Sequence, residues 1–140
     1  MKISAKDSYL LEQYKWYKNT RGYWVCTNDS RLYLHRLIMG NPEGSVDHIN
    51  GDQEDNRREN LRSCNQSQNC ANSKISRNNT SGYKGVSWNR ALKKWHAYIM
   101  VNRKRIHLGY FASKIRAARA YDKAATQYFG KFARLNGVKE

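Results

Sequence analysis

The sequence predicts an α+β protein made of two small modules joined by a polar segment. The chain has 140 residues, of which 39% are hydrophobic, and this favours small modules with modest cores over one large core. Short runs with alternating apolar residues indicate β-strands, and one alanine-rich run has the period of an amphipathic helix. We expect a first module over residues 1–72, a linker over 73–81 and a second module over 82–140.

The first module is expected to contain short strands, a long polar loop, a returning strand and a final helix. Asn65 is the expected cap of that helix, because an asparagine side chain accepts a hydrogen bond from the first turn. The expected elements are strands in "GYWVCT" (22–27) and "RLYLHRLIM" (31–39) that lead into a brief helix, a strand in "SVDHI" (45–49), a loop over 53–60, a strand in "LRSC" (61–64) and a helix in "NQSQNCANS" (65–73).

The second module is expected to be a three-stranded antiparallel sheet packed on one helix. Strand-like runs lie at 82–89, 94–101 and 103–111, and a helix over 112–129 ends at Gly130. A period of two places the apolar residues on one sheet face and leaves the other face basic and aromatic. The helical stripe expected to cover the apolar face is Ile115, Ala118, Tyr121, Ala125 and Tyr128.

The positive charge is concentrated in the second half of the chain. The formal net charge is +15; residues 1–72 carry +1 and residues 73–140 carry +14. Such an asymmetry is typical of a half that binds a polyanion, and by charge alone DNA, RNA and an anionic membrane all remain open. No run of 18 apolar residues predicts a membrane span, and three cysteines without a C-x-x-C pair predict reduced thiols and no structural zinc.

The stretch "VDHINGDQEDNRRENLRSCNQSQN" (46–69) combines an acid, an imidazole and two amides. Asp47 and Asn69 would offer one anionic and one neutral oxygen if the helix packs across the hairpin, and hard oxygen ligands suit Mg²⁺. A neutral His48 beside such an ion could take a proton from water. These groups together are typical of phosphodiester hydrolysis.

The words "LHRLIMG", "VDHING", "DNRRENLR" and "QNCAN" resemble the HNH endonucleases of the phage and intron homing branch. The resemblance implies a ββα-metal finger in which Asp47 and Asn69 bind one divalent ion per chain, Mg²⁺ first and Mn²⁺ as the alternative. It implies that His48 is the general base and that Asn60 hydrogen-bonds across the loop and holds His48 in position. We expect Asp55 to be a solvated loop acid, and the same stretch leaves open whether Arg57, Arg58 and Arg62 contact DNA or only solvent.

Residues 82–136, with the words "YKGV", "LGYF", "AARAYDKAA" and a closing "LN", resemble the plant Apetala/ethylene-response-factor (ERF-like) DNA-binding domain. In that family the sheet reads the major groove of double-stranded DNA. Three plant arginines are replaced here by serine, methionine and histidine, so the plant target sequence does not transfer. The DNA-binding residues expected from the resemblance and from the polar sheet face are Lys84, Ser87, Trp88, Arg90, His96, Tyr98, Met100, Arg105 and His107.

The two resemblances predict a homing-type, metal-dependent DNA endonuclease, an enzyme that nicks duplex DNA. We expect a monomer or a DNA-induced dimer, no membrane partner, a phage-type source and a cytoplasmic location at the host nucleoid. The rival interpretations are a DNA-binding transcription regulator with a purely structural finger and an RNA-binding protein. The retained finger residues argue against the first rival, and the missing RNA-recognition signature argues against the second.

Overall fold

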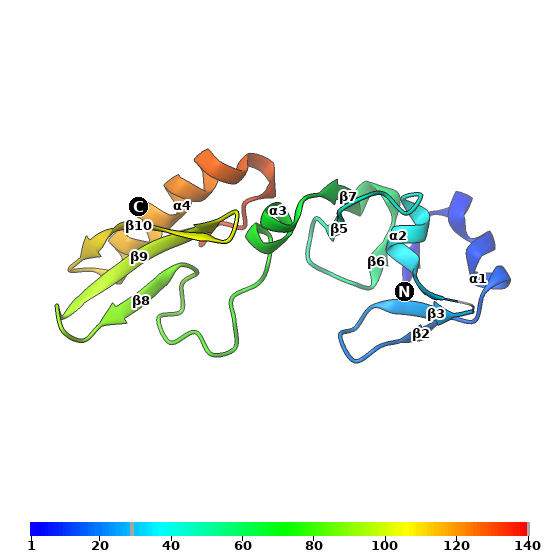
Figure 1. Cartoon of the computed structure of the whole chain (residues 1–140), viewed down its shortest axis with the longest axis horizontal. Coiled ribbons are helices and arrows are strands. Elements are labelled where there is room, and N and C mark those ends of the chain that lie inside the picture. Colours follow the sequence, from blue (N-terminus) through cyan, green and yellow to red (C-terminus); the bar gives the residue numbers. More distant parts are fainter. Residues whose placement is uncertain (29, 140) are drawn as a thin grey trace. The chain divides into compact units, whose positions relative to one another are not determined.

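The computed structural model describes residues 1–28 and 30–139 and divides into two compact units, Met1–Asn69 and Cys70–Glu140 (Figure 1). Each unit has its own sheets and its own core. Helices and strands are mixed, with antiparallel pairing in most sheets, so the protein is of the α+β class. Among the described residues no helix combines the length and the apolar character needed to cross a membrane.

The first unit is built from short elements, most of them in the expected places. Asn65 caps the last helix as expected, since its Oδ1 accepts from the backbone NH of Gln68 at 2.8 Å, and Gln68 Oε1 accepts from the NH of Asn65 at 2.9 Å. The elements are β1 (Lys2–Ile3), α1 (Tyr9–Gln13), β2 (Tyr17–Lys18), β3 (Trp24–Thr27), β4 (Arg31–Tyr33), α2 (Leu34–Ile38), β5 (Ser45–His48), β6 (Asp55–Asn56), β7 (Leu61–Cys64) and α3 (Gln66–Ala71), with 3₁₀ turns at Ala5–Asp7 and Arg58–Asn60.

The region expected to be only a polar loop contains β6, which pairs in parallel with β1 at the N-terminus. Asp55 is 1% exposed there, so its expected role as a solvated acid is wrong. The Arg57 guanidinium donates to both Asp55 oxygens at 2.7 Å, and these hydrogen bonds lower the pKa of Asp55 to about 2. The pairing joins residues more than fifty positions apart, which local periodicity does not reveal.

The core of the first unit lies beneath the β5–β7 hairpin. Five apolar side chains from four different elements form it: Leu10, Leu34, Ile38, Val46 and Leu61. Burial of these side chains fixes the hairpin on α1 and α2, because apolar area removed from water stabilises a fold by about 25 cal/mol per Å². The hairpin that carries Asp47 and His48 is therefore held in place by the core of the first unit.

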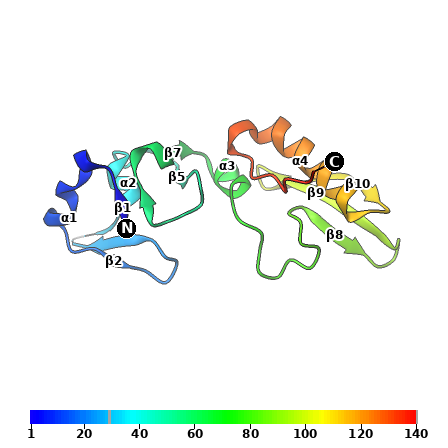
Figure 2. The ribbon, with the colours of Figure 1, turned by 180° about the vertical axis from the view of Figure 1, so that it is seen from behind.

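The second unit is the expected three-stranded antiparallel sheet with one helix. Its strands β8 (Val86–Asn89), β9 (Lys94–Val101) and β10 (Lys104–Phe111) lie in the order β10-β9-β8, and α4 (Lys114–Phe129) covers one face of the sheet (Figure 2). Ser113 caps α4 by accepting from the NH of Ile115 at 3.2 Å.

The buried stripe of α4 differs in part from the expected one. Ile115 and Tyr128 are 41% and 50% exposed, so their assignment to the stripe is wrong. Small side chains bring α4 close to the sheet: a Cβ added to Gly85 would lie 2.1 Å from the Tyr121 ring. Because the helix lies so close to the sheet, most of its buried residues are alanines, and the larger Ile115 and Tyr128 lie at the exposed edges of the helix. The buried residues of α4 are Ala117, Ala118, Tyr121, Ala124, Ala125 and Phe129.

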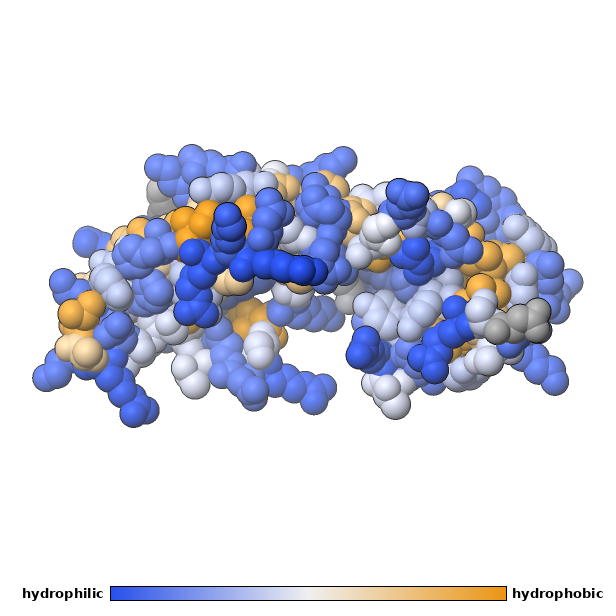
Figure 3. Space-filling view, in the orientation of Figure 1, coloured by the Kyte–Doolittle hydropathy of each residue, from blue (hydrophilic) through white to orange (hydrophobic). Residues whose placement is uncertain are grey.

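The segment that precedes the sheet packs on the second unit. Ala71 is 4% exposed and belongs to the cluster of Ile99 and Tyr121, while Ser81 is 3% exposed and donates to the carbonyl of Tyr83 at 2.9 Å. Hydrophilic side chains cover most of the face drawn in Figure 3, in keeping with a mean hydropathy of −0.95. Cys26, Cys64 and Cys70 form no disulfide within the part of the chain that the structure describes.

Candidate functional site

The β5–β7 hairpin buries both members of the Asp47–His48 pair. The two strands pair antiparallel, with Asp47 opposite Arg62 and His48 opposite Leu61. Asp47 is 7% exposed and His48 is 5% exposed. Buried polar groups are costly without hydrogen bonds, so the partners of these two side chains determine what they can do.

His48 is held by an asparagine that the sequence analysis did not single out. Its Nε2 lies 3.0 Å from Oδ1 of Asn56, which is 1% exposed. The Asn56 Nδ2 donates to the carbonyl of Gln53 at 3.1 Å, and this identifies Oδ1 as the oxygen facing the ring. The neutral tautomer that matches this amide donates from Nε2 and has its lone pair on Nδ1, the atom that can then accept a proton. Asn56 takes this position because β6 pairs with β1, and a pairing between such distant residues leaves no local pattern in the sequence.

Asn60 makes the expected hydrogen bonds across the loop. Its Nδ2 donates to Oδ1 of Asn50 at 2.9 Å and to the carbonyl of Asp55 at 2.8 Å, and its Oδ1 accepts from the NH of Asn50 at 3.1 Å. The backbone NH of Ile49 donates to the carbonyl of Asn60 at 2.8 Å. Asn60 thus orders the backbone that follows His48, while Asn56 contacts the His48 ring itself.

Asp47 forms a buried ion pair with Arg62. Nε and Nη2 of Arg62 donate to Oδ2 of Asp47 at 3.0 and 2.8 Å. The contact is a charge-assisted hydrogen bond, and a carboxylate is also a ligand that hard metal ions prefer. The carboxylate of Asp47 and the amide oxygen of Asn69 are ligand types that suit Mg²⁺ or Mn²⁺, and an ion at Asp47 would share the carboxylate with Arg62.

A hollow of about 290 Å³ opens on the first unit beside His48. Asn69 lines it, and so does His35, whose ring centroid lies 5.1 Å from that of His48. Neither Asp47 nor His48 is among the lining residues: His48 is next to the hollow through its contact with the His35 ring, and Asp47 pairs with Arg62. The lining residues are Arg21, Tyr23, Tyr33, His35, Arg36, Ser45, Val46 and Asn69.

The basic side chains around the hollow differ in their charge and in their hydrogen bonds. Burial lowers the pKa of His35 to about 3, with further contributions from His48 and Arg36, so His35 is neutral at ordinary pH. The Arg36 guanidinium is fixed on the carbonyls of Pro42 and Gly44 at 2.6 and 2.7 Å. The Arg21 guanidinium makes no hydrogen bond or ion pair within residues 1–28 and 30–139, which leaves it as a cation facing the hollow.

The three arginines left open by the sequence all pair with buried carboxylates. Arg57 pairs with Asp55 and Arg62 pairs with Asp47, as described above. Arg58 donates through Nε and Nη2 to both oxygens of Asp7 at 2.8 and 2.6 Å, and these hydrogen bonds lower the pKa of Asp7. Ion pairs within the first unit therefore explain why Arg57, Arg58 and Arg62 occur in this stretch.

In the second unit the polar face of the sheet gathers most of the expected DNA-binding residues. The His96 Nε2 lies 2.8 Å from Nδ1 of His107, and the Arg105 guanidinium lies 4.4 Å from the Tyr98 ring centroid. A register shift between His107 and Gly109 adds Tyr110 opposite His96, a residue that simple alternation misses. By strand register the residues of this face, here called the polar face, are Ser87, Asn89, Lys94, His96, Tyr98, Met100, Arg105, His107 and Tyr110.

Three expected DNA-binding residues lie elsewhere. Trp88 pairs across strands with Trp95, which packs on the helix side of the sheet, and their ring centroids are 5.0 Å apart. Arg90 lies exposed in the turn between β8 and β9. The ammonium group of Lys84 donates to backbone carbonyls of the segment before the sheet, at 3.3, 2.5 and 2.9 Å, and these belong to residues 70, 71 and 73.

Comparisons with known proteins find matches to parts of both units. Residues 32–71 match the model of the HNH endonuclease family, and residues 81–131 match the AP2 domain. No solved structure matches.

Two kinds of relative share parts of the chain. A protein of Acanthamoeba polyphaga mimivirus, named an HNH endonuclease, is 29% identical over 136 residues, which are 92% of this chain and 70% of that protein. The AP2-like ethylene-responsive transcription factor TOE2 of Arabidopsis thaliana is 39% identical over 62 residues, and an APETALA2-like protein of Oryza sativa is 38% identical over 60 residues. These stretches are 44% and 43% of this chain but only 13% and 14% of the plant proteins. In chain order, a match to the HNH endonuclease model is therefore followed by a match to the AP2 domain model.

Proposed function

We propose that this protein is a metal-dependent DNA endonuclease of the homing type, which hydrolyses one phosphodiester bond in duplex DNA. The observation that carries the proposal is the buried His48–Asn56 pair at 3.0 Å, which presents Nδ1 as the proton acceptor. The His48 ring contacts His35, which lines a hollow together with Arg21 and Asn69. A base, a cation and an oxygen donor within an HNH domain favour hydrolysis of a phosphodiester.

Asp47 and Asn69 are the residues that would hold the metal ion, with Mg²⁺ preferred and Mn²⁺ as the alternative. When bound, a divalent ion supplies positive charge to the phosphate oxygens and to the leaving oxygen. A single protein carboxylate is less negative charge than dedicated cation sites normally carry. Oxygens of the DNA phosphate would complete the ligand set, so ion and DNA should bind together.

Each of three side chains of the first unit has a separate role in the proposed hydrolysis. His48 Nδ1 accepts a proton from a water molecule as that water attacks phosphorus, and Asn56 keeps Nε2 protonated and the ring in place. Arg21 contacts an oxygen of the attacked phosphate and offsets its growing charge. The bond from phosphorus to the 3′ oxygen breaks, and the 3′ oxygen takes a proton from solvent. The products are a 5′-phosphate and a 3′-hydroxyl end.

The AP2 unit holds the duplex through the polar face of its sheet. A twisted sheet enters the major groove, where base edges distinguish all four base pairs. The face offers the Arg105 guanidinium and the His96–His107 pair for base edges and Tyr98 and Tyr110 for sugars or thymine methyl groups. One active site per chain gives a nick, so a monomer nicks and two chains on one duplex would cut both strands.

The test is conversion of supercoiled plasmid to nicked circles in the presence of Mg²⁺. We expect His48→Ala to reduce the nicking rate by about 10² to 10⁴, the usual contribution of a general base, and to leave duplex affinity unchanged. A chelator should abolish nicking by the unchanged protein. DNA binding without nicking would overturn the proposal in favour of a DNA-binding regulator, and full activity of His48→Ala would overturn the assignment of the base.

A further inference from the structure

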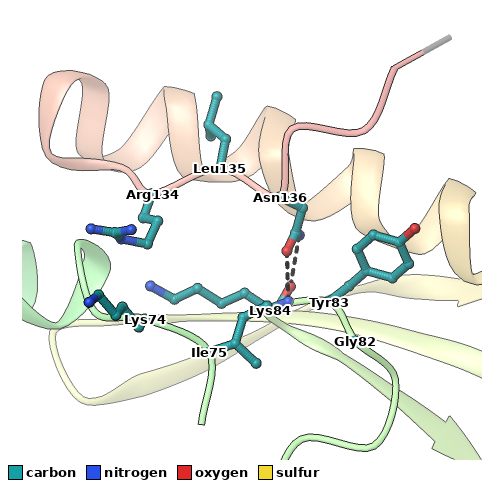
Figure 4. Close-up of a pocket in the computed structure, with 8 residues that line it drawn as sticks. All are labelled: Lys74, Ile75, Gly82, Tyr83, Lys84, Arg134, Leu135 and Asn136. Atoms are coloured by element: carbon teal, nitrogen blue, oxygen red, sulfur yellow. Dashed lines mark hydrogen bonds between the residues drawn. The ribbon is translucent and has the colours of Figure 1, made fainter. Parts of the chain in front are cut away.

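A cationic pocket of about 410 Å³ lies on the second unit, away from the candidate active-site residues in sequence (Figure 4). Figure 4 shows the ammonium groups of Lys74 and Lys84 and the guanidinium of Arg134 at the same end of this pocket. The C-terminal segment closes one wall, where Asn136 accepts from the NH of Lys84 at 2.7 Å and donates to its carbonyl at 3.1 Å.

Arg134 is fixed in place with part of its guanidinium unused. Its backbone NH donates to the carbonyl of Ala71 at 3.3 Å, and its Nε donates to the carbonyl of Asn72 at 2.7 Å. Its two terminal nitrogens make no hydrogen bond to any residue that the structure describes, and the same holds for the ammonium group of Lys74. A guanidinium held through Nε presents its remaining donors as a fork, which suits the two oxygens of a phosphate.

The pocket has no negative charge to balance these cations. None of its lining residues is acidic, and Asp122 is the single carboxylate between residues 70 and 139. Asp122 is occupied elsewhere, since it accepts from the NH groups of Asn136 and Gly137 at 2.7 and 3.1 Å. Burial, and then the nearby charge of Arg134, lower the pKa of Lys84 to about 8, as expected for positive charge without a counterion.

Lys84 itself organises the pocket rather than offering donors to a ligand. Its three hydrogen bonds go to the carbonyls of Cys70, Ala71 and Ser73, and an ammonium group has three protons. These contacts hold the segment that carries Lys74 against the start of the sheet. The groups left for a ligand are the terminal nitrogens of Arg134 and the ammonium of Lys74.

The pocket adjoins the polar face of the sheet. A neighbouring hollow of about 320 Å³ shares Lys74, Ile75 and Lys84 with it and extends to Tyr98 and Met100. Tyr98 and Met100 belong to the polar face. A duplex held on that face would pass its sugar-phosphate backbone over the edge of the sheet where these hollows open.

We propose that Lys74 and Arg134 bind one backbone phosphate of the duplex that the sheet holds, an inference that rests on the proposed DNA binding. Arg134 supplies two parallel donors and Lys74 a point charge, and both meet the same phosphodiester. Phosphate contacts carry no base information. The pocket therefore adds affinity and fixes the position of the duplex on the sheet without changing which sequence is preferred.

The experiment measures duplex affinity of the full chain by fluorescence anisotropy over a range of salt concentrations. The pocket variant is Lys74→Gln with Arg134→Gln, and the matched control is Arg116→Gln with Lys123→Gln, two exposed cations of α4. Each phosphate contact contributes about 0.9 units to the slope of log affinity against log salt. We expect the pocket variant to lose about one unit, since two side chains share one phosphate, and to weaken preferred and random duplexes by the same factor. The control should keep the slope of the unchanged protein.

Equal slopes in the pocket variant and the control would overturn the proposal, and so would a weakening confined to one sequence. If the unchanged protein fails to bind duplex DNA, the proposed function fails with it, and this outcome is distinct from equal slopes.

Two further measurements test the proposal. Lys74 is exposed, so Lys74→Glu tests the pocket if Arg134→Gln unfolds, and we expect at least tenfold weaker binding to every duplex. Thermal unfolding with inorganic phosphate or chloride at equal ionic strength tests a free anion as the ligand. Stabilisation by phosphate that Lys74→Glu removes, together with an unchanged salt slope, would assign the pocket to a free anion and overturn its assignment to DNA.

Discussion

Buried hydrogen-bond partners decide what the reactive side chains of the first unit can do. His48 has Nδ1 as its proton acceptor only because Asn56 accepts from Nε2, and Asn56 is oriented in turn by the carbonyl of Gln53. Arg62 donates two hydrogen bonds to the Asp47 carboxylate and fixes its position. Aspartate and asparagine are common in turns and helix caps, so the residue types alone do not indicate a catalytic role. The hydrogen bonds described here distinguish these residues from ordinary turn residues.

At this scale we predict the effects of two substitutions of Asn56. Asn56→Ala should slow nicking about 10- to 100-fold, a part of the contribution of a general base, because the ring loses its fixed tautomer and orientation. Asn56→Asp should retain most of the rate, since a carboxylate also accepts from Nε2. Single-turnover nicking measures the rate, and anisotropy should show unchanged duplex affinity for both variants.

Asn78→Ala, at an exposed position of the second unit, is the control for removing an amide. A folded Asn56→Ala protein that nicks at the full rate would show that the hydrogen bond has no part in catalysis.

At the scale of elements, the antiparallel sheet separates a packed face from a polar face. Ala97 and Ile99 are buried under α4, while the neighbouring His96 and Tyr98 turn to the polar face. The register shift after His107 changes which residues of β10 share that face. Side chains of the polar face contact one another: the His96 and His107 rings stack, and the Arg105 guanidinium lies over the Tyr98 ring.

For this element we predict that Arg105→Ala weakens binding at a preferred sequence by roughly 1 to 3 kcal/mol and relaxes the preference there. The reason is that an arginine presents paired donors to a guanine edge, which alanine cannot replace. Binding selections on randomised duplexes measure the preference before and after the change, with Arg116→Ala as the control. Uniform weakening on all sequences, with a salt slope lower by about one unit, would show that Arg105 meets phosphate instead.

At the scale of the whole molecule, charge and structure divide the chain at nearly the same place. The net charge is +1 over residues 1–72 and +14 over residues 73–140. Along the sequence, the boundary between the two compact units falls between Asn69 and Cys70. The segment after Cys70 is packed into the second unit through Ala71 and through the hydrogen bonds of Lys84 and Arg134. A DNA-binding fragment should therefore include that segment.

We predict that a fragment of residues 65–140 folds, binds duplex DNA with a steep salt dependence and does not nick it. A fragment of residues 77–140 should unfold at a lower temperature, because it loses the buried Ala71 and leaves Lys84 without its carbonyl partners. Thermal unfolding and anisotropy on the two fragments measure this. Equal stability would contradict the role given to residues 70–73, and nicking by either fragment would contradict the division of labour.

The sequence by itself determined the α+β class, the two modules and the local elements that depend on neighbouring residues. The alternation in β9, the cap at Asn65 and the stop of α4 at Gly130 are local signals, and each corresponds to an element of the structure. The motif words around Asp47 and His48 were likewise sufficient to indicate an HNH domain, which the family match confirms.

Only the tertiary structure decided which groups meet. The pairing of β1 with β6 buries Asp55 and brings Asn56 to His48, and the register shift brings Tyr110 to the polar face. The packing of residues 70–75 turns Lys84 inward and leaves Lys74 and Arg134 around one pocket. The physical reason is that these contacts join positions far apart in the chain, where closure of the loop and burial of the partners set the geometry and no local period records it.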